Sequence, residues 1–242
     1  MYMRRFINGL LDIVFPPVCL VCKRRLSSDA VDTAVCPGCW GAIRKNIPPF
    51  CYSCGRHLDV KRSAKNICQS CMKHPLHFDR AVSPCRYDGT VKELIHAFKY
   101  GNKPHLGRTL SRLMIDFIEE YDIFANSIDA VIPMPLHSAR LREREFNQAA
   151  VLGGHIAQRF NKTMLPETLR RKHMTKTQTG LETPERFSNV RGCFEIREPG
   201  PIAGKNILLV DDVLTTGATA SEAAITLKET GARVVLVITA AC

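Results

Sequence analysis

Apolar and polar positions follow two periods over residues 79–242. Continuous apolar runs, typical of strands covered on both faces, predict buried strands at 128–132, 205–211 and 233–240, and an edge strand is expected at 80–88. Apolar residues at helical spacing predict helices at 91–100, 104–119, 148–160 and 220–230. Strands that alternate with helices favour an open α/β sheet.

The segment 207–219 contains the most specific chemical pattern in the chain. Four apolar residues precede Asp211 and Asp212, and a threonine-rich loop then leads into a helix. Ligands of open α/β sheets bind beyond the carboxyl ends of strands. Backbone N–H groups at a helix N-terminus suit a phosphate, and paired carboxylates suit sugar hydroxyls or Mg²⁺. The pattern predicts a ribose 5-phosphate site whose phosphate-binding residues are Thr215, Thr216, Gly217, Ala218 and Thr219.

The strand expected at 128–132 ends in a second loop that is followed by arginines. We expect Arg140 and Arg144 to bind pyrophosphate, because guanidinium groups make bidentate contacts with phosphate oxygens. At the start of the helix expected from 148, cations would oppose the helix dipole unless an anion binds there. Surface arginines at a helix start are the alternative. The loop residues expected to complete this site are Pro133, Met134, Pro135, Leu136 and His137.

Residues 169–191 form a long, polar and poorly periodic stretch between two expected strands. Long loops inside compact domains are usually functional lids or disordered. We expect a mobile lid that closes over pyrophosphate. Its predicted contacts come from Arg170, Arg171, Lys172, Lys176, Thr177, Gln178 and Thr179.

Most of the 11 cysteines fall in four CxxC pairs that recur at nearly regular intervals. A CxxC turn directs two thiolates at one ion, and two such turns complete a tetrahedral Zn²⁺ site. We expect two structural zinc ribbons paired in sequence order, with a cross-brace as the alternative; a disulfide framework is disfavoured because no secretion signal is visible. Gly38, Gly41 and Gly55 are expected to supply left-handed backbone. The predicted ligands are Cys19, Cys22, Cys36, Cys39, Cys51, Cys54, Cys68 and Cys71.

Positive charge is concentrated in the N-terminal part of the chain. The formal net charge is +11, and most of the excess of lysine and arginine over acidic residues lies within positions 1–80. A basic lobe indicates a polyanionic partner such as nucleic acid, although a solvated basic surface explains it equally well. We expect an N-terminal helix plus double zinc ribbon at 1–78 and a second domain at 79–242.

The first residues of the chain are apolar at helical spacing up to Pro16-Pro17. They predict a short helix packed on the protein, with peripheral membrane contact as the alternative. No run approaches the roughly 18 apolar residues of a spanning helix, and no small-residue cleavage site follows. We therefore expect a cytoplasmic protein without stable membrane insertion.

These motifs together resemble the ComF/GntX family, a branch of the type I phosphoribosyltransferase-like proteins that carries an N-terminal double zinc ribbon. The resemblance implies an α/β fold with a parallel, Rossmann-like sheet after the ribbons. The resemblance covers nearly the whole chain. Besides the CxxC pairs, it rests on Arg186 and on segments 98–100, 133–136, 140–148, 177–181, 189–191 and 210–219. One departure is Glu145, at a position where the family often has glycine.

The resemblance implies a site for Mg²⁺ and phosphoribosyl pyrophosphate. Asp211 and Asp212 would hold the ribose hydroxyls, directly or through Mg²⁺, and Arg140 would neutralise the leaving pyrophosphate. Catalysis in such enzymes consists largely of positioning and charge neutralisation. The resemblance also implies a role in natural competence, in the import or use of single-stranded DNA beside a helicase-like partner. It specifies no acceptor and leaves open whether any transfer occurs.

A second class of function stays open. The domain would then bind phosphoribosyl pyrophosphate or a nucleic-acid phosphate without turnover, and the protein would be a DNA-binding adaptor that uses its basic ribbons. The salt dependence of single-stranded DNA binding distinguishes an adaptor that follows the phosphate backbone from one that does not.

Overall fold

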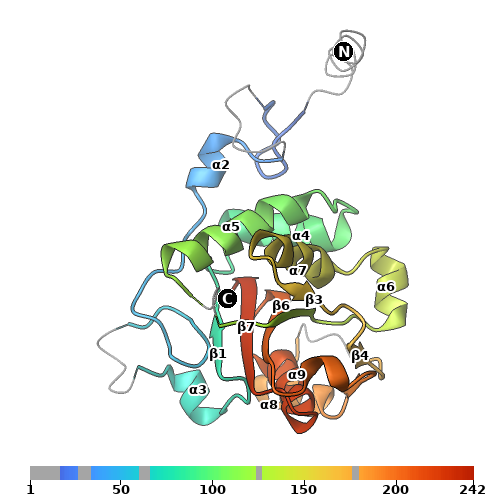
Figure 1. Ribbon diagram of the computed structural model, residues 1–242. Coiled ribbons are helices and arrows are strands. Elements are labelled where there is room, and N and C mark those ends of the chain that lie inside the picture. Colours follow the sequence, from blue (N-terminus) through green and yellow to red (C-terminus); the bar gives the residue numbers. More distant parts are fainter. Residues whose placement is uncertain (1–16, 27–33, 60–65, 124–126, 176–179) are drawn as a thin grey trace.

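Figure 1 shows the chain as a computed structural model that describes residues 17–26, 34–59, 66–123, 127–175 and 180–242. The helix expected before Pro17 lies outside the described residues. Within them, no helix combines the length and the apolar character needed to cross a membrane.

A five-stranded parallel sheet forms the centre of the molecule. In spatial order its strands are β1 (Arg80–Val82), β7 (Val234–Ala241), β6 (Asn206–Val213), β2 (Ala130–Pro133) and β3 (Thr163–Met164). The middle strand β6 pairs with β7 on one side and with β2 on the other, in parallel register. The predicted α/β fold with a parallel sheet is confirmed.

Side chains along β6 alternate between two separate hydrophobic cores. Leu208 and Val210 belong to one core, whereas Ile207 and Leu209 belong to the other. Successive residues of a strand point to opposite faces of the sheet. Because both faces are covered, every position must be apolar, and the strand therefore reads as a continuous apolar run.

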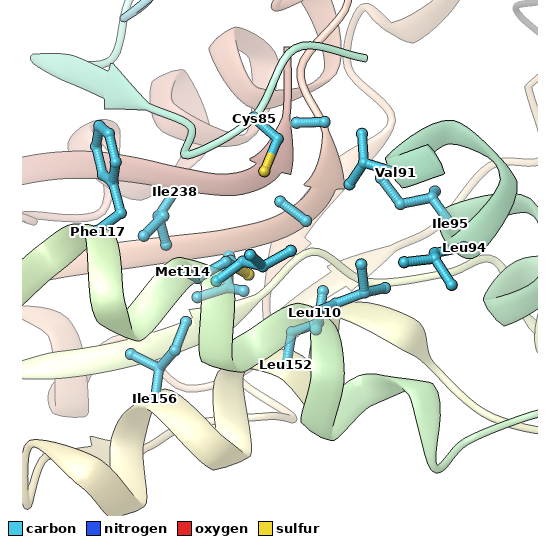
Figure 2. Close-up of a cluster of buried hydrophobic side chains, with 14 of the residues drawn as sticks. Cys85, Val91, Leu94, Ile95, Leu110, Met114, Phe117, Leu152, Ile156 and Ile238 are labelled. Atoms are coloured by element: carbon cyan, nitrogen blue, oxygen red, sulfur yellow. The ribbon is translucent and has the colours of Figure 1, made fainter. Parts of the chain in front are cut away.

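Helices cover both faces of the sheet. Their bounds are α4 (Gly89–Tyr100), α5 (Leu106–Glu120), α7 (Gln148–Arg159), α8 (Thr183–Val190) and α9 (Ala218–Glu229). Figure 1 shows α4, α5 and α7 on one side of the sheet, with α8 and α9 on the other. In the first core, Leu110 and Met114 of α5 lie among side chains of α7 and β7, including Ile156 and Ile238 (Figure 2).

Two regions contain more regular structure than the sequence predicts. The stretch 169–191 includes β4 (Leu169–Arg171), which pairs antiparallel with β5 (Phe194–Ile196), and the helix α8. The region expected as an open loop after β2 contains the short helix α6 (Ser138–Arg144). Both were missed because these segments have few buried residues, so their apolar period is weak; none is buried in α6.

The expected edge strand at 80–88 is shorter than predicted. Regular pairing ends at Val82, and Cys85 makes only isolated bridges, to Lys45 and to Ala241. Pro84 lies between Val82 and Cys85 and has no N–H to donate to a ladder.

The cysteine turns of the N-terminal region use two kinds of backbone. Gly55 has a φ of 71°, and a Cβ there would lie 2.3 Å from the carbonyl oxygen of Ala81, so only glycine fits. The corresponding position after the first pair is Lys23, with a φ of 62°. The expectation for Gly38 and Gly41 is wrong, because both lie in the short helix α2 (Pro37–Gly41).

The ribbon region packs into the same two cores as the sheet. Val35 and Ile43 join the core beneath α5. Leu58 and Phe78 join the core beneath α9. The short helix α3 (Gln69–Lys73) lies between these two residues in the chain. The domain boundary between residues 78 and 79 stays a prediction.

Glu145 ends α6 in the left-handed conformation, with a φ of 65°. A residue with a side chain costs about 1 kcal/mol there relative to glycine, which relieves the strain. Glu145→Gly should therefore raise the midpoint of thermal unfolding by about 2–4 °C in scanning calorimetry. The control Glu143→Gly, at an exposed position inside α6, should lower the midpoint because glycine disfavours helix. Equal shifts for the two variants would contradict this account.

Candidate functional site

A cavity of about 640 Å³ lies beyond the carboxyl ends of β2 and β6. The end of β6 and the loop into α9 line one part of it, and the loop after β2 lines another. Arg171 of β4 and Arg186 of α8 approach from the second face of the sheet, and Lys99 approaches from α4. Open parallel sheets bind their ligands at this position.

Asp211 and Asp212 lie next to each other at the end of β6 and face different surroundings. Asp212 continues the register of Leu208 and Val210, so its side chain points to the face covered by α4. There Lys99 Nζ lies 2.7 Å from Asp212 Oδ1, with only 18% of the lysine side chain exposed. Burial opposes the charge on Lys99, but the Asp212 carboxylate raises its pKa. Lys99 is therefore a buried cation held by one of the two carboxylates.

Asp211 has no such direct ion pair in the described structure. Burial and the neighbouring Asp212 carboxylate raise the pKa of Asp211 to about 7, against the opposing effect of Lys99. An added cation or several hydroxyl donors would stabilise the charged form of this carboxyl. The pair thus fits the ligand set of a hard divalent cation or of sugar hydroxyls.

The loop between β6 and α9 offers backbone rather than side chains at the helix start. Gly217 is the N-cap of α9 with a φ of 81°, and it provides no capping side chain. Thr216 Oγ1 accepts from the N–H of Ala218 at the long distance of 3.4 Å. The first-turn N–H groups and the positive end of the helix dipole therefore suit an anion.

Buried donors without a partner surround the cavity. Within the described residues, Arg144 Nε, Gln148 Nε2 and Arg171 Nε are buried and make no hydrogen bond. All three side chains line the cavity. A buried unpaired donor is costly, so anionic oxygens in the cavity would remove a penalty that the protein otherwise bears.

The sequence analysis placed Arg140 and Arg144 at the start of the helix that is now α7. In the structure both residues lie on α6. Asn147 caps α7, because its Oδ1 accepts from the N–H of Ala149 at 3.0 Å. Its Nδ2 donates to the carbonyl oxygen of Met134 at 3.1 Å, which ties α7 to the loop after β2. The helix-dipole argument for an anion at α7 is therefore wrong, and the case for these arginines rests on their place in the cavity.

The structure brings many of the predicted ligand-binding residues to this cavity. They are Met134, Pro135, Leu136, Arg140, Arg144, Asp211, Asp212, Thr215, Gly217, Ala218 and Thr219. Thr216 lines a second cavity on the other side of the loop. Their roles stay predictions.

Not every predicted residue is found in the lining of the first cavity. Pro133 is the last residue of β2, and His137 caps α6 by accepting from the N–H of Ala139 at 3.3 Å. In the described part of the chain, neither lines the cavity. Arg170 and Lys172, which were predicted as lid contacts, are also absent from the lining. Lys176, Thr177, Gln178 and Thr179 lie outside the described residues.

The sequence analysis assigned no chemical role to two residues at the site. Lys99 follows the apolar stripe of α4, and only the fold shows that it reaches Asp212. Arg56 comes from the N-terminal region and donates to the carbonyl oxygens of Leu214, at 3.4 Å, and Thr215. A lysine inside an apolar helix face was the available signal for Lys99; Arg56 had none.

The eight CxxC cysteines form two groups of four in sequence order. One group is Cys19, Cys22, Cys36 and Cys39, and the other is Cys51, Cys54, Cys68 and Cys71; the sulfur atoms of each group lie within 4.8 Å of one another. The Cys22–Cys36 and Cys54–Cys68 sulfurs are 3.7 and 3.6 Å apart. A tetrahedral site with Zn–S bonds near 2.3 Å requires sulfurs about 3.8 Å apart. Both groups therefore fit two zinc ribbon sites, and the grouping is not a cross-brace.

The second cysteine group is attached to the loop before α9. Leu76 packs against Gly217, where a Cβ would lie 3.0 Å from Leu76 Cδ2. The backbone N–H of His77 donates to Ser221 Oγ at 3.0 Å, within α9. Together with Arg56, these contacts make the second ribbon part of the support for the loop.

Two models of known domains match the chain. The double zinc ribbon domain matches residues 10–75, and the phosphoribosyl transferase domain matches residues 147–242. The second match contains β6, the Asp pair and the loop into α9.

Relatives match over most of their length. Competence protein F of Haemophilus influenzae is 28% identical over 216 residues, which cover 88% of this chain and 91% of that protein. DNA utilization protein YhgH of Salmonella typhimurium is 27% identical, with 93% and 96% covered. Competence protein ComFC of Bacillus subtilis is 25% identical, with 88% and 90% covered. The chain is thus similar over most of its length to competence proteins F and ComFC and to YhgH, and it joins a match to a double zinc ribbon with a match to a phosphoribosyl transferase domain.

The raised pKa of Asp211 predicts a pH-dependent cost to folding. Because its folded pKa of about 7 exceeds the unfolded value, the cost is absent well below pH 4, grows up to about pH 7 and is complete above it. Asp211→Asn should therefore raise the unfolding midpoint of the ligand-free protein at pH 8 by on the order of 3–5 °C, and by less at pH 5.5. Thermal melts at both pH values test this. An equal or larger gain at pH 5.5 would contradict the assignment.

Loss of one zinc site should affect the ribbons unequally. Cys54→Ser, in the buried group, should lower the unfolding midpoint by more than about 10 °C, whereas Cys22→Ser, at an exposed ligand, should lower it less. The metal content of each variant, measured by atomic absorption, should fall from two zinc ions towards one. Unchanged zinc content in both variants would rule out the assigned ligands.

Proposed function

We propose that this protein binds phosphoribosyl pyrophosphate in the cavity at the carboxyl ends of β2 and β6. Asp211 and Asp212 hold the ribose hydroxyls, directly or through Mg²⁺. The 5-phosphate lies against the loop at 215–219, and the pyrophosphate lies against the loop after β2 with Arg140 and Arg144. Lys176, Thr177 and Gln178, with the rest of the segment between β4 and α8, complete the pyrophosphate site.

The observation that carries the proposal is the combination of charges in one cavity. Two adjacent carboxylates stand directly before a helix start, and Lys99, Arg140, Arg144 and Arg171 line the same space. A ligand with a diol between two phosphate groups satisfies both halves of this arrangement. The buried donors Arg144 Nε and Arg171 Nε, which lack partners, support an anion on the arginine side.

The chemistry that these residues support is transfer of a pentosyl group, with pyrophosphate as the leaving group. The protein's contribution is to position the ribose and to neutralise the leaving group with arginines. Bound Mg²⁺ would add further neutralisation, and Asp211 and Asp212 are the residues able to hold it. No described side chain is identified as a general base, and the acceptor is not specified by these residues.

We place this activity in natural competence, in the handling or import of single-stranded DNA in the cytoplasm. The support comes from relatives named competence protein F, competence protein ComFC and DNA utilization protein YhgH. The basic N-terminal region agrees with a nucleic-acid partner. A helicase-like partner remains part of the proposal and rests on the family resemblance alone.

A non-catalytic adaptor is the second candidate, and the charge distribution favours it. Lysines and arginines outnumber acidic residues by more than two to one within positions 1–80, and Arg56 of this region touches the loop at 215–219. For an adaptor that binds the phosphate backbone, the affinity for single-stranded DNA should fall steeply as the salt concentration rises. A flat salt dependence would remove this candidate.

Binding of Mg²⁺-phosphoribosyl pyrophosphate is tested by thermal unfolding of the zinc-loaded protein. A ligand at about 100 times its Kd stabilises by about 2.7 kcal/mol, which corresponds to a shift on the order of 5–10 °C. Asp211→Asn and Asp212→Asn should each abolish most of the shift, because each removes a carboxylate from the ribose site.

The matched control is Asp116→Asn, at a carboxylate on α5 with 57% of its side chain exposed. It should keep the full shift. Two variants of the pair are needed because Asp212→Asn also leaves Lys99 without its ion pair. A folded wild-type protein that shows no shift would refute the proposed ligand.

A further inference from the structure

A second cavity, of about 530 Å³, lies on the other side of the loop that precedes α9. The second zinc ribbon contributes Asn46, Arg56 and His57 to its wall, and the loop contributes Thr215 and Thr216. The rest of the lining comes from the segment between β1 and α4, from Leu214, from Arg186 of α8 and from Cys242, which follows β7. The cavity thus joins the ribbon region to the end of the central sheet.

Three guanidinium groups give this cavity a positive character. They belong to Arg56, Arg86 and Arg186. Within the described residues, neither Arg56 nor Arg186 forms an ion pair; Arg56 donates to the carbonyls of Leu214 and Thr215, and Arg186 Nε donates to the carbonyl of Leu181 at 2.9 Å. Backbone carbonyls fix the direction of a guanidinium without cancelling its charge.

The carboxylate in the lining does not offset these charges. Asp88 is held by Arg44, with Nε 2.7 Å from Oδ1 and Nη2 2.6 Å from Oδ2. Arg86 Nε is farther away, at 3.7 Å from Asp88 Oδ2. Asp88 is therefore neutralised chiefly by Arg44, which lies outside the lining, and the cavity keeps an excess of positive charge.

The two cavities share part of their walls. Tyr87, Arg186, Leu214 and Thr215 line both. A ligand in the second cavity would therefore lie beside whatever occupies the first. Small-molecule sites typically have volumes of roughly 300 to 1000 Å³, and the second cavity falls within this range. Tyr87 is half-buried and packs against the first core, and its aromatic ring is of the kind on which nucleobases stack.

We propose that the second cavity binds the phosphate group of an acceptor nucleotide, held by Arg56, Arg86 and Arg186 with its base towards Tyr87. That the ligand is the acceptor rests on the proposed function of the first cavity; that it is a nucleotide phosphate rests on the arginines and the tyrosine. The second zinc ribbon then forms part of the binding wall, because Arg56 follows the ligand turn at Cys51 and Cys54. The phosphate can belong to a free nucleotide or to the end of a DNA strand.

The test uses calorimetric titration of the zinc-loaded protein with three probes. Thymidine 5′-monophosphate and a 5′-phosphorylated thymidine tetranucleotide carry the phosphate, and thymidine lacks it. We expect both phosphorylated probes to bind and thymidine to bind at least tenfold more weakly. Equal affinity for the two phosphorylated probes assigns the site to a free nucleotide, whereas tighter binding of the tetranucleotide assigns it to a strand end.

Two variants locate the binding. Arg86 lines only the second cavity, and 54% of its side chain is exposed. Arg197, also 54% exposed and 3.5 Å from Glu167, lines neither cavity among the described residues and serves as the control. Arg86→Gln should weaken the phosphorylated probes by about fivefold to tenfold, because a charge-assisted contact is lost. Arg197→Gln should leave their affinity unchanged.

The outcome separates this inference from the proposed function. Thymidine binding as tightly as its monophosphate, or equal affinities for Arg86→Gln and Arg197→Gln, would overturn the nucleotide site. Arg86→Gln should also keep the thermal shift with Mg²⁺-phosphoribosyl pyrophosphate. A normal shift without Arg86-dependent nucleotide binding defeats only the second cavity, and nucleotide binding without a shift defeats only the first.

Discussion

Two carboxylates placed side by side at the end of a buried strand are the constraint on which the site depends. Their repulsion and burial raise the pKa of Asp211 to about 7 and require a cation beside Asp212, which Lys99 supplies from α4. The alternation along β6 determines that only Asp212 faces α4. The charged form of Asp211 has no direct ion pair among the described residues, so a cation or hydroxyl donors would stabilise it. Across the same cavity lie arginines whose buried Nε atoms lack hydrogen-bond partners, and anionic oxygens would stabilise them. A ligand with a diol and anionic groups can donate hydrogen bonds to Asp211 and accept them from the arginines at the same time.

The zinc ribbons are part of this arrangement and not an appendage to it. The second cysteine group is buried in the core beneath α9, and its neighbours Arg56, Leu76 and His77 contact the loop and the first turns of α9. The loop at 215–219 is consequently supported on one side by the sheet and on the other by a turn whose cysteines fit a zinc site. Stability of the ribbon and geometry of the loop are coupled in this way.

The sequence predicted those features that depend on local pattern. The apolar run before Asp211, the threonine-rich loop and the CxxC spacing are each complete within a few residues, so the central strand, the helix after it and the grouping of the cysteines could be anticipated. Lys99 and Arg56 could not, because their partners lie far away in sequence and are reached only through tertiary packing. Glu145 shows a third case: its left-handed φ of 65° belongs to the end of α6, a helix that the sequence did not predict. The regular structure in 169–191 was missed because α8 has a single buried residue, Val190.

The central claim is that the Asp pair and the loop at 215–219 together hold a ribose 5-phosphate. A crystal structure of the zinc-loaded protein with Mg²⁺ and phosphoribosyl pyrophosphate tests it most directly. The account predicts electron density for the 5-phosphate against the N–H groups at the start of α9, with the ribose hydroxyls facing Asp211 and Asp212. Density for the ligand elsewhere, or an unchanged cavity at saturating ligand, would contradict it.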